Sequence, residues 1–234
     1  MSHVEIGQDI YTPTVSSAGT APTTARPNAG WLYVSEAAEW LTTGRSDALT
    51  FTLGVTGGPS LARWTQHIAH SVGPAYNRPT DWSRQVAFEP GAIARFEHAA
   101  RFATPASAPL GIDFVPHAGA SLGNVLTAAD AGARLRSGWR LSHPWLPPAR
   151  DAGFNLVIGA SARAVARDLF LDGNTFQGGP RVGHESLVES GEAGFDFHVH
   201  GVSLGYRAVT DSRAYRTGPK WHPWASMTGS ITMQ

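Results

Sequence analysis

Two side chains that could activate a water molecule stand four residues apart in the stretch GPSLARWTQHIAHSVG, residues 58–73. Gln66 and His70 are spaced i,i+4, so on a helix they lie one turn apart on the same side. A neutral imidazole accepts a proton at ambient pH, which suits His70 to the role of general base. Gln66 could orient either the imidazole or the substrate. The alternative is a loop helix with solvated polar residues, which spacing alone favours.

The element that must position this pair is a short helix inside a chain of strands. Ser60 is expected to cap it and Gly73 with Pro74 to end it. At about 100° per residue, one apolar stripe is formed by Leu61, Trp64, Ile68 and Val72. We expect the stripe to anchor the helix, so that His70 is presented outward on the opposite side. Arg63 falls near that side, and we assign it to substrate binding.

A second pattern, GASLG at residues 119–123, fits the G-x-S-x-G nucleophile elbow around Ser121. The elbow requires a strand, a sharp turn and a helix, but both flanks of this segment have the pattern of strands. We therefore interpret Ser121 as a residue near a strand end, and a soluble serine hydrolase is the weakest of our hypotheses.

Two further patterns could bind a metal ion. His198 and His200 lie two apart, on one predicted strand with Asp196, but no third ligand stands at a fixed spacing. The segment LDGNTF, residues 171–176, lacks the remaining positions of a calcium loop. We interpret the first set as polar residues that face a lumen and the second as a turn, so the metal ligands remain unknown.

Most of the chain alternates polar and apolar residues. In ALTFTLGVTG one face carries Leu49, Phe51, Leu53 and Val55 and the other carries threonine and glycine. This period of two is typical of a strand between two different environments. About ten such segments follow one another, near residues 2–12, 31–41, 48–57, 91–103, 109–121, 125–138, 154–170, 187–200, 202–214 and 224–233. The segment at residues 14–30 has the composition of a polar loop, and no domain boundary interrupts the chain.

Composition excludes several classes of protein. Eighteen basic residues balance eighteen acidic ones, so no electrostatic footprint for nucleic acid is present. The chain has no cysteine, which excludes disulfides and thiolate metal sites. No run of eighteen apolar residues could form a transmembrane helix, and residues 1–13 lack the pattern of a secretory signal.

Long alternating strands fit either a soluble sandwich or barrel or a transmembrane barrel, which places apolar residues on lipid and polar residues in the lumen. Charged side chains stand in mid-strand, and aromatic residues cluster near strand ends as interface girdles do, at GWLY (30–33), FNLV (154–157) and KWHPW (220–224). These features weakly favour the membrane barrel.

Seven motifs occur together in a recognisable order. They are GQDIYTP (7–13), RPNAGWLY (26–33), GP followed by Gln66 and His70, DW…Q…EPG (81–91), PHAGASLGNV (116–125), ARDLFLDGNTF (166–176) and YRT (215–217). In this order they resemble the outer-membrane lipid A 3′-O-deacylase family of Gram-negative bacteria, and the resemblance covers nearly the whole chain.

The resemblance implies a fold and an activity. The family is a twelve-stranded β-barrel of the cell outer membrane that removes the 3′-acyloxyacyl group from lipid A in a calcium-dependent esterase reaction. His70 matches the family's catalytic histidine and Gln66 the glutamine one turn before it, while calcium stabilises the oxyanion. The expected partners are lipid A or lipopolysaccharide and the outer membrane, and we expect a monomer.

The sequence also departs from the family's pattern. The family's first hairpin, with an Asn-Asp pair and a threonine that support calcium, has no counterpart here, and DRPYAG is replaced by ARPNAG at residues 25–30. An acidic residue shortly after the helix is missing, and the last residue is Gln234 rather than an aromatic residue. Two outcomes stay open, a deacylase and a non-catalytic structural or lipid-binding barrel that is inactive as given.

We expect residues 1–234 to form a single barrel domain with about ten of the twelve family strands and one short helix in a rim loop. An open barrel would expose unpaired backbone groups to lipid. Either the ten strands close on themselves, or the natural protein is longer, which we favour.

Overall fold

The computed structural model describes residues 2–13, 24–72, 82–104, 110–146 and 152–231. Its long strands are β1 (Ser2–Tyr11), β2 (Ala29–Leu41), β3 (Arg45–Thr56), β4 (Pro90–Ala100), β6 (Leu110–Gly123), β7 (Leu126–Trp139), β8 (Gly153–Asp168), β9 (Leu187–Val199), β10 (Val202–Ser212) and β11 (Trp221–Ile231). A short strand, β5 (Phe102–Ala103), pairs with β6. Each segment predicted from the period of two corresponds to one long strand, which confirms the all-β antiparallel fold.

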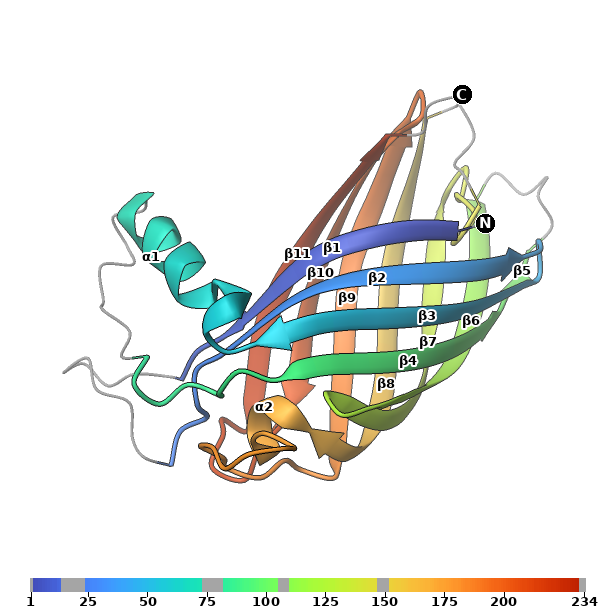
Figure 1. The fold of residues 1–234 in the computed structure, drawn as a ribbon. Helices are drawn as coiled ribbons and strands as arrows, with labels where there is room; N and C mark the ends of the chain where they lie inside the picture. The colour runs from blue at the N-terminus through green and yellow to red at the C-terminus, as the bar shows by residue number, and fades with distance from the viewer. Residues whose placement is uncertain (1, 14–23, 73–81, 105–109, 147–151, 232–234) are drawn as a thin grey trace.

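Each long strand pairs with its neighbours in the sequence, so the sheet is a meander that curls around an axis (Figure 1). Over the described residues no pairing joins β1 to β11, so the curled sheet is open between them. Of the two alternatives, closure of the ten strands on themselves is therefore not observed. That two further family strands belong to the barrel stays a prediction.

The outer face of the sheet is apolar. On β8, the side chains of Phe154, Leu156 and Ile158 are exposed, and those of Asn155 and Val157 between them are buried. Since successive side chains of a strand point to opposite faces, the exposed apolar residues of β8 all lie on its outer face, and on β3 Phe51 and Leu53 are exposed in the same way. This is the orientation of a membrane barrel and the reverse of a soluble one.

The inner face is polar and carries several ion pairs. The Asp113 carboxylate accepts from Arg101 Nε at 2.8 Å and from Arg136 Nη1 at 3.3 Å. On β9 and β10, Asp196 accepts from Arg207 Nη2 through both oxygens, at 2.8 and 2.9 Å. Buried charges persist when they are paired and hydrogen-bonded, so these bridges let charged side chains occupy the lumen.

One end of the barrel carries all the described helices, namely the 3₁₀ helix η1 (Gly58–Ser60), α1 (Ala62–Val72) and α2 (Leu169–Asp172) (Figure 1). We predicted a strand through residue 170, but Asp168 caps α2 by accepting from the Phe170 N–H at 2.9 Å. Gly173 follows α2 with φ of 83°, a conformation that favours glycine at a helix end.

No described helix is long and apolar enough to cross a membrane.

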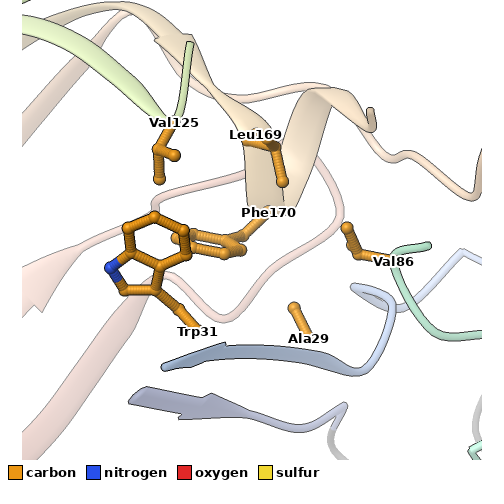
Figure 2. Packing of buried hydrophobic residues seen from close by; sticks show 6 residues of the cluster. All are labelled: Ala29, Trp31, Val86, Val125, Leu169 and Phe170. Carbon is orange, nitrogen blue, oxygen red and sulfur yellow. The ribbon is translucent and has the colours of Figure 1, made fainter. Parts of the chain in front are cut away.

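A hydrophobic cluster packs inside the barrel at the helix-bearing end (Figure 2). It consists of Ala29, Trp31, Val86, Val125, Leu169 and Phe170. The ring centroids of Trp31 and Phe170 lie 6.5 Å apart, edge to face, and Gly91 has no side chain because a Cβ there would overlap the Trp31 ring and Val125. Trp31 is only 3% exposed, and Tyr33 packs against the cluster. The prediction that the aromatic residues of GWLY form an interface girdle is therefore wrong.

Candidate active site on the outer wall

The chain leaves β3 through a tight turn before α1 begins. Ser60 Oγ donates to the Gly57 carbonyl at 2.6 Å, within η1. Leu61 then adopts a left-handed conformation with φ of 58°, and its carbonyl accepts from the Thr65 N–H at 3.0 Å. The residue whose carbonyl accepts the first intrahelical bond is the N-cap. The N-cap of α1 is therefore Leu61. The expectation that Ser60 caps α1 is wrong, because the Ser60 hydroxyl bonds to Gly57 in the preceding turn.

The start of α1 packs on the outer face of β1 and β2. Trp31 points inward, so its neighbour Gly30 points outward. A Cβ on Gly30 would overlap Ser60 Oγ and Ala62 Cβ, so glycine allows this close approach. From β1, Gln8 Nε2 donates to the Ser60 carbonyl at 2.5 Å. These contacts fix the helix to the wall outside the lumen.

The apolar stripe of α1 faces away from the protein. Leu61, Trp64 and Ile68 are 52%, 63% and 40% exposed, and the Val72 side chain lies outside what the structure describes. Ala62, on the opposite side, is 1% exposed. The prediction that the stripe anchors the helix is wrong, and the barrel orientation gives the reason. Beside a membrane barrel the surroundings of the wall are hydrocarbon, which favours apolar side chains on the outside.

Gln66 lies on the side of α1 that faces the protein. Trp82 Nε1, in the segment before β4, donates to Gln66 Oε1 at 2.8 Å. An indole N–H is only a donor, so this contact assigns the amide oxygen to Trp82 and directs the amide NH₂ elsewhere. The bond therefore holds one orientation of the amide, with its two N–H donors left for another acceptor.

His70 belongs to the last turn of α1, and its side chain lies outside what the structure describes. The helical period places its backbone position one turn after Gln66, near the side of Ala62. The i,i+4 relation is thus present, but it lies on the protein-facing side and not on the outward one. Arg63 and His67 are exposed on the same helix, and the residues predicted to end it, Gly73 and Pro74, lie outside the described residues.

The alternative sites are not assembled. Ser121 is buried within β6, and its hydroxyl accepts from Arg95 Nη1 at 3.3 Å, so no elbow forms. His198 is buried on β9, as predicted for a lumen residue, but His200 is in the β9–β10 turn with φ of 50°. Within the described ranges, no group of three or more His, Cys, Asp or Glu side chains could hold a metal ion.

Three of the sequence motifs meet in a network whose role the sequence did not reveal. The carboxylate of Glu89, which is 2% exposed, accepts from Asn124 Nδ2 at 2.9 Å, from Asn174 Nδ2 at 3.1 Å and from the Thr175 N–H at 2.7 Å. Burial alone would raise the pKa of Glu89, but these hydrogen bonds hold it below its usual value. The network joins the loop that carries α1 to the β6–β7 and β8–β9 connections.

A family model described as "Outer membrane protein LpxR" matches residues 2–233. The chain belongs to the LpxR family. Membership places this family member in the cell outer membrane and among proteins that modify lipid A, in agreement with the resemblance of its motifs and with its apolar outer face.

The solved structure of LpxR from Salmonella typhimurium is similar to the chain, with a TM-score of 0.86 and 19% sequence identity. The match covers 99% of this chain and 83% of that one. At this identity the likeness shows the fold alone. No curated protein matches the chain.

Proposed function

We propose that this LpxR family member is a carboxylic ester hydrolase that removes the 3′-acyloxyacyl group from lipid A. The observation that carries the proposal is the position of α1. The start of the helix bearing Gln66 and His70 is docked on the outer wall of β1 and β2, and its apolar stripe is exposed, as are the outward apolar side chains of the strands. A substrate whose acyl chains lie in the membrane would reach such a site sideways.

The helix-bearing end of the barrel has the features of the extracellular end. It carries the connection of residues 57–89, whereas turns at the opposite end include the short ones at Thr42–Gly44 and His200–Gly201. Outer-membrane barrels have short periplasmic turns and longer extracellular loops. This orientation supports a site in the outer leaflet, where lipid A resides in Gram-negative bacteria.

In the proposed reaction, His70 takes a proton from a water molecule as the water oxygen attacks the ester carbonyl. The proton then passes to the departing sugar alkoxide, which leaves the free fatty acid and the sugar hydroxyl. General base catalysis of this kind contributes about 10²–10⁴ in rate. The NH₂ of Gln66, oriented by Trp82, would donate to the substrate, and Arg63 would bind the substrate.

Calcium is expected from the resemblance, but the described residues do not fit a site for it. Calcium takes six to eight oxygen ligands, several from carboxylates, and the described part of the chain contains no cluster of acidic side chains suited to a metal. Gln66 Oε1 is bonded to Trp82. We therefore derive no catalytic step through calcium, and calcium dependence stays a prediction of the resemblance.

The second candidate is a non-catalytic barrel with a structural or lipid-binding role. It is favoured by Ala25, which stands where the family has an aspartate, and by the absence of a described metal cluster. Both candidates share the fold and the membrane, so only the chemistry separates them.

The test is to express the chain in an outer membrane that contains unmodified lipid A and to analyse the extracted lipid by mass spectrometry. We expect loss of the mass of one acyloxyacyl group with the wild-type chain and with His67→Ala, an exposed control on the same helix. His70→Ala should abolish this loss while the barrel still assembles.

Chelation of calcium during an assay of the purified protein tests the calcium dependence.

Unmodified lipid A with the wild-type chain would favour the non-catalytic barrel. Equal activity of the wild type and His70→Ala would refute His70 as the base.

A further inference from the structure

A cavity of about 600 Å³ opens at the helix-bearing end, away from α1. It lies between the β8–β9 and β10–β11 connections. Its walls are formed by Arg167, Asp172, Arg181, Val182, Gly183 and Arg216. The lining therefore includes three arginines and one aspartate, which makes the cavity cationic.

The cavity is built by specific bonds between its two loops. The Glu185 N–H donates to the Ala214 carbonyl at 2.9 Å, next to a bridge that pairs His184 with Tyr215. This pairing brings the segment of Arg181 beside that of Arg216. On the other side, the Val182 and Gly183 N–H groups donate to the Leu171 carbonyl in α2, at 2.9 and 3.1 Å. Both loops are thus held in one arrangement.

Asp172, the single carboxylate that lines the cavity, already has hydrogen-bond partners within the protein. His184 Nδ1 lies 2.7 and 2.8 Å from the two oxygens of Asp172, and the Asp168 N–H donates to Asp172 Oδ2 at 2.8 Å. Burial alone would raise the pKa of Asp172, but these hydrogen bonds and His184 hold it below its usual value. The carboxylate is ionised at neutral pH and is committed to the cap of α2.

The three arginines contrast with those of the barrel interior. Arg95, Arg136 and Arg207 each pair with a carboxylate. Arg167 instead donates to neutral oxygens, those of Asn124, Gly173 and Thr175, at 2.7–3.0 Å. Over the described residues, no salt bridge to a carboxylate is formed by Arg181 or Arg216, which are exposed. Their charge remains available to an anion, and a guanidinium binds phosphate in bidentate geometry.

We infer that this cavity binds a phosphate group on the sugar headgroup of an outer-leaflet glycolipid. The position of the cavity relative to the apolar outer surface indicates that the phosphate belongs to a lipid headgroup. Leu187 and Trp221, the first residues of β9 and β11, are 55% and 52% exposed and mark the edge of the apolar outer surface below these loops. Tryptophan is typical of the membrane–water interface. The cavity lies just beyond that edge, at the level of headgroups.

The inference deepens the proposed function, on which it rests for the choice of lipid A as the glycolipid. It assigns to lipid A a second contact, through its phosphate and at a distance from the helix that carries His70. Binding at this cavity does not require hydrolysis. It can therefore be measured with the His70→Ala variant, which keeps the substrate intact.

The experiment measures binding of lipid A to the purified barrel in detergent, with the His70→Ala background and three probes, namely bisphosphorylated lipid A, enzymatically dephosphorylated lipid A and inorganic phosphate. We expect dephosphorylation to weaken binding about tenfold or more, as does the loss of a charged hydrogen bond. Adding Arg181→Glu and Arg216→Glu should weaken binding of the phosphorylated probe similarly. Lys220→Glu, an exposed charge reversal in the same loop, should leave binding unchanged.

Equal affinity for the two lipid probes, or no effect of the two arginine substitutions, would overturn the inference. Inorganic phosphate that binds as tightly as lipid A would show a free-phosphate site and contradict the glycolipid. The proposed hydrolysis is judged separately, since its failure changes the mass spectra of lipid A and not these affinities.

Discussion

At the scale of single residues, Gln66 and Glu89 show what spacing reveals and what it leaves out. The i,i+4 relation of Gln66 and His70 follows from the local period and was predicted. Trp82, which orients Gln66, and Asn174, which binds Glu89, stand 16 and 85 residues away from their partners. No local pattern links residues at such separations. The motifs DW, EPG and DGNTF are visible in the sequence, but the contacts among them depend on how the loops fold together.

The Glu89 network makes a prediction about stability. Glu89→Gln should lower the free energy of unfolding by about 1–3 kcal/mol, because an amide NH₂ would face groups that are themselves donors. Urea unfolding of the refolded barrel, followed by tryptophan fluorescence, measures the change. Glu185→Gln, in the β8–β9 loop, is the matched control and should have a much smaller effect. Equal effects of the two substitutions would show that the network contributes nothing specific.

The pH dependence of unfolding follows from this network and from the hydrogen-bonded carboxylate of Asp172. Hydrogen bonds hold the pKa values of Glu89 and Asp172 below their usual values. A lowered pKa contributes stability that is fully present above the unfolded values, about 4.3 for Glu and 3.9 for Asp, and is lost as the pH falls through the folded values. We expect stability to be level near neutral pH and to fall below about pH 4. The fall should be smaller in Glu89→Gln.

At the scale of the element, α1 shows how the surroundings decide which face of a helix is buried. Its apolar stripe was predicted correctly from the period but assigned to the wrong side. A period of 3.6 shows that two faces differ, and it does not show which of them meets the protein. In water the apolar face packs inward, whereas beside a membrane barrel the hydrocarbon lies outside. The orientation of the strands, with their apolar faces outward, decides which face of α1 meets the protein. The sequence favoured that orientation only weakly.

The contact between α1 and β2 predicts the effect of adding a side chain at Gly30. Gly30→Val should displace the start of α1, because its side chain would overlap Ser60 and Ala62. A displacement of about 1 Å at a reacting group can lower the rate about 10²-fold, so we expect a loss of lipid A hydrolysis while the strands still assemble. Gly229→Val is the control, since a Cβ at Gly229 meets no atom within 4 Å. Full activity of Gly30→Val would contradict the importance of this contact.

At the scale of the whole molecule, the period of two was sufficient to locate every long strand. It succeeds because each strand separates hydrocarbon from a polar lumen, so that alternation continues along its length. The pairing order followed as well, since short connections join neighbours in a meander. The hydrophobic cluster around Trp31 was not predicted, because its members come from β2, the β6–β7 connection, α2 and the loop before β4. The opening between β1 and β11 likewise concerns strands that are distant in the sequence.

The central claim is that the helix bearing Gln66 and His70 lies on the membrane side of the wall. The most direct test uses the absence of cysteine in the chain. A fluorophore on Ile68→Cys is compared with one on the lipid-facing Leu53→Cys and one on the lumen-facing Thr52→Cys, in bilayers containing a lipid-borne quencher. The account predicts that the probe at residue 68 is quenched about as strongly as the probe at residue 53. The account is contradicted if the probe at residue 68 is quenched as weakly as the probe at residue 52 and is reached only by a water-soluble quencher.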